Sequence, residues 1–132
     1  MLKMDLTIPA HIDCITPLVE TVLFVMAKTG IGVGKELEVE TALREALANA
    51  ITHGAGGDPS KFVRCSVAFE TAGSVFLIVS DPGQGFDTEC LPDPTDSSHL
   101  FDDHGRGIYL INHLMDEVKF KRNGAEIHMR KY

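Results

Sequence analysis

Apolar residues recur at helical spacing in two successive segments near the N-terminus of the chain. The first segment ends before Gly30, and Pro17 fits it only within the first turn, so a helix begins between residues 12 and 17. The second segment follows Gly34 and ends at Gly54. The apolar positions are Ile12, Ile15, Leu18, Val19, Val22, Leu23 and Met26, then Val39, Leu43, Ala46, Leu47 and Ala50. This spacing predicts two consecutive helices.

A second pattern, the alternation of apolar and polar residues, predicts strands. The alternation is regular over residues 63–69 and weaker over residues 4–8, which we expect to form an edge strand. It also runs through residues 118–121 and 125–131, which a glycine-containing turn joins as a hairpin. Residues 75–79 are continuously apolar, as in a central strand covered on both faces, or by helices on one face and a lid on the other.

The order of these elements predicts the fold class. A third helical pattern lies over residues 108–114, after a long loop and before the hairpin. The order is therefore strand, helix, helix, strand, strand, loop, helix, strand, strand. Helices grouped on one face of a mixed, mostly antiparallel sheet form a two-layer sandwich of the α+β class. A chain of 132 residues is expected to be a single domain, residues 1–132.

Charge and cysteine content narrow the classes of partner and the location. The net charge is −7, whereas nucleic acids and anionic membranes favour a basic surface. The three cysteines have no paired spacing, the N-terminus lacks a signal-peptide pattern, and the longest apolar run is too short to span a bilayer. We therefore expect a cytoplasmic protein with reduced thiols that binds neither nucleic acid nor membrane directly.

The second predicted helix carries an acid and an amide one turn apart. Glu45 lies nearly opposite the apolar stripe, Asn49 lies one turn further, and His53 follows at the helix end. This spacing is typical of a solvated helix face. It also fits a site in which Asn49 offers an oxygen to Mg²⁺ and Glu45 accepts a proton from an attacking hydroxyl. Zinc is the alternative metal, but an amide is a poor zinc ligand. His53 is expected to compensate the helix dipole or to pack.

A carboxylate follows the apolar strand directly. Asp81 begins a turn that contains Gly83 and Gly85, and a polar segment without regular pattern continues to His104. Loops longer than ~12–15 residues in a compact domain are usually lids or disordered segments. We expect a mobile lid over residues 82–105, with Asp81 at its base accepting a hydrogen bond from an exocyclic amine such as that of adenine. A plain Asp-Pro-Gly turn is the alternative.

A third glycine-rich segment precedes the last predicted helix. Gly105 and Gly107 flank Arg106 at this position. Glycine at a helix N-terminus allows backbone N–H groups to approach a phosphate closely, and an arginine adds positive charge. Together with Asp81 and the Glu45–Asn49 pair, this segment predicts a nucleotide site.

These motifs resemble those of the Bergerat-fold (GHKL, histidine-kinase-like) ATPases. More closely, they resemble the anti-sigma-factor serine kinases of the RsbW and SpoIIAB type. Glu45, Asn49 and His53 resemble the N-box of that family, and residues 81–85 and 105–110 resemble its two glycine boxes. The resemblance extends over nearly the whole chain. It implies the Bergerat sandwich with an ATP lid, with ATP and Mg²⁺ as ligands.

The resemblance also implies a role for each site residue. It implies that Asn49 binds Mg²⁺, that Asp81 binds the adenine amine, and that Glu45 is the base that activates the serine of a partner protein. It also implies that Gly83 and Gly85 contact the base and allow the lid to move, and that Gly105 and Gly107 contact the phosphates.

Two positions depart from the family pattern. Asp103 stands where histidine kinases often have a further glycine, so we expect a sparser phosphate loop. Ala125 stands where many relatives have a hydroxyl residue, which removes one expected contact near the base. Neither position carries a group on which the predicted chemistry depends.

Three functions are compatible with a nucleotide site in this sequence. The first is a homodimeric, ATP-dependent protein-serine kinase that phosphorylates an anti-sigma-factor antagonist and sequesters a sigma factor. The second is an ATP-binding regulatory module without phosphotransfer, against which Glu45 argues. The third is a detached histidine-kinase catalytic domain, against which the lack of a helical hairpin with a phosphoacceptor histidine argues. An α+β domain without a nucleotide site is the remaining alternative.

Overall fold

The computed structural model describes residues 1–83 and 103–132, the latter with residues 103–105 as backbone alone. Within these ranges the elements follow the predicted order, with short helical turns between some of them. They are β1 (Leu2–Pro9), η1 (Ile12–Cys14), α1 (Ile15–Thr29), α2 (Glu36–Asn49), η2 (Ala50–Gly54), β2 (Phe62–Phe69), β3 (Val75–Ser80), α3 (Asp103–Leu114), β4 (Glu117–Lys121), η4 (Arg122–Gly124) and β5 (Glu126–Lys131). Of the helices in these ranges, none has the length and apolar character that crossing a membrane requires.

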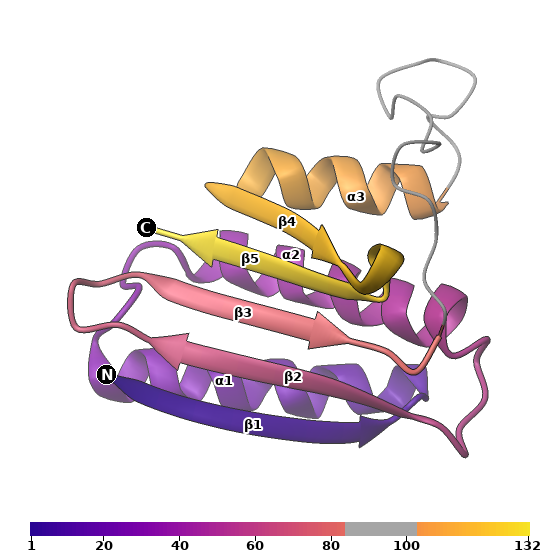
Figure 1. Cartoon of the computed structure of the whole chain (residues 1–132). Coiled ribbons are helices and arrows are strands. Elements are labelled where there is room, and N and C mark those ends of the chain that lie inside the picture. Colours follow the sequence, from indigo (N-terminus) through magenta and orange to yellow (C-terminus); the bar gives the residue numbers. More distant parts are fainter. Residues whose placement is uncertain (84–102) are drawn as a thin grey trace.

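One sheet of five strands organises the described part of the chain. Its strand order is β1-β2-β3-β5-β4, and each of these neighbouring pairs is antiparallel. The helices α1, α2 and α3 lie on one face of the sheet (Figure 1). The α+β two-layer class, the edge position of β1 and the C-terminal hairpin are therefore confirmed.

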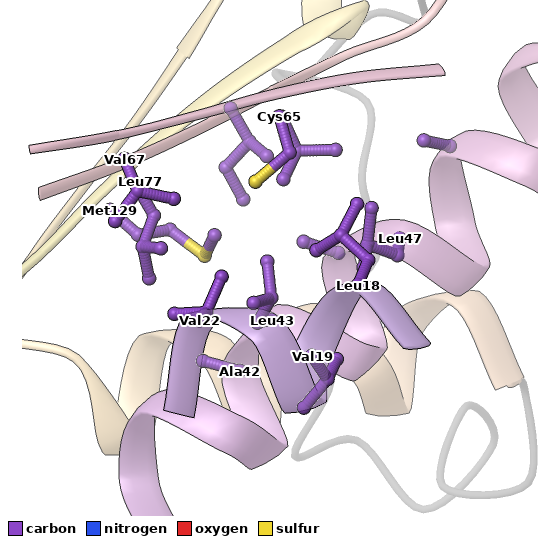
Figure 2. Packing of buried hydrophobic residues seen from close by; sticks show 14 of the residues in the cluster. Leu18, Val19, Val22, Ala42, Leu43, Leu47, Cys65, Val67, Leu77 and Met129 are labelled. Carbon is purple, nitrogen blue, oxygen red and sulfur yellow. The ribbon is translucent and has the colours of Figure 1, made fainter. Parts of the chain in front are cut away.

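The core lies between the sheet and the helices. Figure 2 shows apolar side chains of α1 and α2 facing those of the strands. Leu43 and Leu47 of α2 are fully buried, as are Cys65 and Leu77 on the sheet. The apolar residues of the predicted helices and strands are the ones that pack in this layer. Ile12 is the exception: it precedes α1 and is 62% exposed. Burial raises the pKa of Cys65 to about 12, so this thiol is a core residue.

The two long helices end differently. α1 ends at Gly30, which has a left-handed φ of 73° and donates its N–H to the Met26 carbonyl at 2.9 Å. α2 continues without a break into η2, a π-helical turn. There the Ala55 N–H donates to the carbonyl of Ala50, five residues back, at 2.9 Å. The predicted end at Gly54 is confirmed, and the last turn is wider than an α-helix.

The apolar run in β3 has a structural explanation on each face of the sheet. Val75, Leu77 and Val79 are buried against the helices, whereas Phe76 and Ile78 are half-buried on the opposite face. On that outer face the Arg130 guanidinium lies 4.7 Å from the centre of the Phe76 ring. In residues 1–83 and 103–132, neighbouring side chains rather than helices cover this second face of the central strand. The lid predicted over residues 82–105 lies mostly outside the described residues.

Candidate functional site

A cavity of about 270 Å³ opens where the end of α2, the start of α3 and one end of the sheet meet. Its walls combine apolar side chains with a small number of polar groups, which is typical of small-molecule sites. The lining residues are Ala46, Asn49, Ala50, His53, Gly54, Val79, Asp81, Gly83, Ile108, Ile111, Phe120, Gly124, Ala125 and Ile127. Two of the predicted motifs therefore contribute to one cavity, since Asn49 and Asp81 both line it.

Asp81 is held by the backbone on both sides. Its N–H donates to the Ala125 carbonyl at 2.9 Å, which extends the β3–β5 pairing by one residue. Its Oδ1 accepts the Gly83 N–H at 2.7 Å. Burial raises the pKa of the Asp81 carboxyl, while the Gly83 hydrogen bond and the charge of Arg122 act in the opposite direction. The site thus presents a fixed hydrogen-bond acceptor beside an apolar cavity.

The apolar walls form the rest of this end of the cavity. They come from both layers of the fold: Val79 on β3 and Phe120 and Ile127 on the C-terminal hairpin belong to the sheet, and Ile108 belongs to α3. The methyl group of Ala125 also lines the cavity and is buried. A flat, largely apolar ring with a donor at its edge matches this combination of walls and acceptor.

Glu45 and Asn49 lie one turn apart on α2, as predicted, but both are half-buried. The apolar stripe places Glu45 on the face of α2 away from the stripe, and in the structure α3 covers part of that face. A Cβ atom at Gly107 would lie 2.8 Å from Glu45 Oε2 and 3.4 Å from Asn49 Nδ2. The backbone of α3 therefore packs directly on this pair, and glycine at position 107 makes the close approach feasible.

The donor set at this end fits a hard cation. The carboxylate of Glu45 and the amide oxygen of Asn49 are oxygen donors, and Mg²⁺ prefers oxygen ligands while retaining several waters. Within the described ranges, no group of three or more His, Cys, Asp or Glu side chains is arranged to hold a metal ion. Asn49 lines the cavity and carries an amide oxygen of the kind that Mg²⁺ accepts as a ligand.

The third predicted segment lies inside a helix rather than before one. α3 begins at Asp103, so Gly105, Arg106 and Gly107 occupy its first turns. The first four N–H groups of an α-helix lack a carbonyl partner within the helix, and Gly105 is among these positions. Arg106 is exposed and Gly107 is buried. Gly85 lies outside the described residues.

The sequence does not predict the apolar walls of the cavity, nor the place of Gly54 in the site. Gly54 was interpreted only as the end of the second helix, yet it lines the cavity and contacts Asp81. The local pattern carries no sign of this contact because its partner follows a different element, β3. His53, which was expected to pack or to compensate the dipole, also lines the cavity.

Comparison with known proteins gives matches over most of the chain. The model of the histidine kinase-like ATPase domain family matches residues 8–131. An anti-sigma F factor from Bacillus cytotoxicus is 37% identical, over 72% of this chain and 68% of that protein. The serine-protein kinase RsbW of Staphylococcus aureus is 28% identical, over 97% of this chain and 85% of that protein.

A solved structure has the same fold. It contains the RsbU and RsbW domains of a Mycobacterium tuberculosis protein and superposes with a TM-score of 0.67 at 16% identity. The match covers 99% of this chain and 32% of the longer one, so this chain spans about a third of that protein. The similarity is one of fold.

Proposed function

Because this chain belongs to the histidine kinase-like ATPase family, in the group of anti-sigma F factors and RsbW-type kinases, we propose that it is an ATP-dependent protein-serine kinase. Its substrate is an anti-sigma-factor antagonist, and it also sequesters a sigma factor. The names of its relatives support these partners, since one is an anti-sigma factor and another a serine-protein kinase. By the same resemblance, the active form is a homodimer.

One observation carries the proposal. Asp81 and Asn49 line the same cavity, and Glu45 lies one helical turn from Asn49. We assign the contact with the base to Asp81, which lies beside Gly54 at the end of η2, the binding of Mg²⁺ to Asn49, and the role of proton acceptor to Glu45, one turn back along α2. A nucleoside triphosphate bound in this way meets the three groups in this order, from its base to its γ-phosphate.

At the base end, Asp81 acts in its ionised form. The carboxylate accepts a hydrogen bond from the exocyclic amine of adenine, and the apolar walls hold the ring. Gly83 fixes one carboxylate oxygen by its 2.7 Å hydrogen bond. The backbone bond from Asp81 N–H to Ala125 fixes the position of the whole residue. Adenine is therefore selected over guanine, which presents a carbonyl oxygen at that position.

At the phosphate end, Glu45 accepts the proton of the attacking serine. The serine oxygen bonds to the γ-phosphorus as the bond to the β–γ bridging oxygen breaks, the proton passes to Glu45, and ADP leaves. Asn49 supplies an oxygen to Mg²⁺, which neutralises developing charge on the phosphates when bound. The phosphates are expected to lie at the N-terminus of α3, where Gly105 and Gly107 allow the backbone to approach them.

The test is phosphotransfer from γ-labelled ATP to a purified candidate antagonist, with analysis of the product's stability in acid. The proposal expects acid-stable phosphoserine. An acid-labile product would indicate histidine phosphorylation. ATP-dependent binding of a partner without any transfer would identify a regulatory module instead.

A thermal-shift measurement tests the nucleotide site separately from the transfer reaction. Mg-ATP at ~100 times its dissociation constant stabilises a protein by ~2.7 kcal/mol, which raises the unfolding midpoint by several degrees. No shift with Mg-ATP would reject the site assignment altogether, whatever the partner.

A further inference from the structure

The π-helical turn η2 continues α2 as a wider turn up to Gly54. The Ala55 N–H donates to the carbonyl of Ala50, five residues back, at 2.9 Å, and beyond the turn the Gly57 N–H donates to the Ile51 carbonyl at 2.8 Å. Such wide turns within helices occur frequently at functional sites. In this chain the wide turn brings Gly54 against the turn that follows β3.

Gly54 contacts the Asp81 side chain more closely than any other residue type could. A Cβ atom at Gly54 would lie 2.1 Å from Asp81 Cγ, 2.3 Å from Oδ2 and 2.5 Å from Oδ1. Cβ atoms in real structures essentially never come within 3.0 Å of a heavy atom from another part of the chain. The backbone conformation does not require glycine at this position, because η2 is a right-handed helical turn. Space for the carboxylate is therefore the reason for a glycine here.

A second glycine encloses the same carboxylate. A Cβ atom at Gly83 would lie 2.5 Å from the Gly54 carbonyl oxygen and 2.8 Å from Asp81 Oδ1. The Gly83 N–H also donates to Oδ1 at 2.7 Å. The carboxylate is thus packed between two backbone segments, one from η2 and one from its own turn. Neither segment leaves room for a methyl group without displacement of the carboxylate.

We propose that Gly54 is a positioning residue for base recognition, because its missing side chain lets the Asp81 carboxylate stay where an adenine amine meets it. The proposal rests on the proposed function, since it assumes an adenine nucleotide in the cavity. A methyl group at position 54 displaces the carboxylate or the turn that carries it. In either case the acceptor moves while the phosphate end of the site, at Glu45 and Asn49, keeps its geometry.

The experiment compares Gly54→Ala with the parent protein, using the dissociation constants of Mg-ATP, Mg-GTP and inorganic tripolyphosphate. We expect Gly54→Ala to weaken ATP binding about 10-fold or more, the order of magnitude of one lost hydrogen bond to a charged group. The ATP-over-GTP ratio is expected to fall towards one. Tripolyphosphate, which has no base, is expected to bind both proteins equally. Unchanged ATP affinity and an unchanged ratio would overturn the proposal.

Gly56→Ala is the matched control. Gly56 lies two residues away, and a Cβ atom there would meet nothing within 4 Å, although its φ of +64° makes alanine strained. This variant is expected to lose stability while the ATP-over-GTP ratio stays at the parent value. If the ATP-over-GTP ratio falls as much in Gly56→Ala as in Gly54→Ala, then general destabilisation, rather than the contact with Asp81, explains the loss of base selectivity.

A double-mutant cycle keeps the test independent of nucleotide binding. With Asp81→Ala present, a methyl group at position 54 has no carboxylate to displace. Gly54→Ala is therefore expected to lower the unfolding midpoint less in that background than in the parent, and to be rescued by it if the single variant does not fold. If the effects of the two substitutions on the unfolding midpoint are additive, or if Asp81→Ala does not rescue a Gly54→Ala variant that fails to fold, the proposed contact between Gly54 and Asp81 is wrong. If the parent fails to distinguish ATP from GTP while the cycle is non-additive, the proposed function fails and the packing argument stands.

Discussion

The two ends of the candidate site are built in different ways. At the base end, Asp81 is enclosed by backbone: two hydrogen bonds of 2.9 and 2.7 Å and the glycines at positions 54 and 83. At the phosphate end, Glu45 and Asn49 are side chains of one helix that face the backbone of another at Gly107. The base end depends on local turns, and the phosphate end depends on the packing of α2 against α3.

This difference predicts that selectivity and catalysis can be changed separately. A substitution at the base end should alter which nucleotide binds, while the transfer step at saturating nucleotide changes little. A substitution at the phosphate end should alter the transfer step, while the choice of base is preserved.

The largest effect is expected for Glu45→Gln, at the phosphate end. Glutamine keeps the shape of the side chain but cannot take the serine proton, so phosphotransfer should fall ~10²–10⁴-fold. Affinity for Mg-ATP should remain close to that of the parent. Single-turnover transfer and equilibrium binding measure the two quantities. Glu40→Gln, on the same helix and paired with Arg44 at 3.1 Å, is the matched control and should retain transfer. Undiminished transfer in Glu45→Gln would exclude Glu45 as the base.

The next effect concerns the base end alone. Asp81→Asn replaces a pure acceptor by a group that also donates, so ATP binding should weaken by ~10–100-fold and the preference over GTP should disappear. Transfer at saturating ATP should change much less than in Glu45→Gln. Titration with both nucleotides measures the ratio. Asp58→Asn, at an exposed loop position, is the control. A retained preference for ATP would contradict the role of Asp81.

A smaller effect is expected for the magnesium dependence of binding. Asn49→Ala removes one oxygen ligand, so the gain in ATP affinity on adding Mg²⁺ should decrease ~10-fold relative to the parent. Titrations with ATP in excess Mg²⁺ and in chelator give this gain for each protein. The ATP-over-GTP ratio should not change. An equal gain in both proteins would show that Asn49 is not a ligand.

The smallest effect is a pH dependence of base recognition. Because burial raises the pKa of Asp81 above the ordinary value of 3.8, a fraction of this carboxyl takes up a proton as the pH falls towards that range. The protonated form accepts the adenine amine poorly, so ATP affinity should decline by less than it does in Asp81→Asn. The contribution of Asp81 to the free energy of unfolding without ligand has the opposite pH dependence. It is greatest at low pH and decreases as the pH rises through the raised pKa. Asp81→Asn should lack this pH-dependent step, and its persistence there would assign it to another group.

Periodicity, together with the positions of glycine and proline, predicts the order of the elements, although it starts α3 at residue 108 whereas the helix begins at Asp103. The apolar stripe of α2 fixes which of its residues reach the core, and the one-turn spacing of Glu45 and Asn49 follows from helix geometry. The half-burial of this pair was not predictable in the same way. It depends on Gly107 of α3, which is distant in sequence, and a helical stripe contains no information about a second helix on its other face.

At the base end, even fewer of the contacts can be predicted from the local sequence. The sequence points to Asp81 because its turn contains two glycines and leads into a long segment without regular pattern. The contact with Gly54 and the apolar walls at Phe120 and Ile127 come from three separate elements that meet only in the folded chain. Glycine at the end of a helix is also so common that its second role, close packing against a side chain, leaves no separate mark in the sequence.

The π-helical turn η2 has a consequence for how this chain can vary. Asn49 and Gly54 belong to one continuous stretch of helix, and they serve opposite ends of the cavity. Insertion or deletion of a single residue between them would rotate one about 100° around the helix relative to the other. The length of the segment from 49 to 54 should therefore be invariant among working versions of this protein, whereas the identity of exposed Thr52 within it should be free to change.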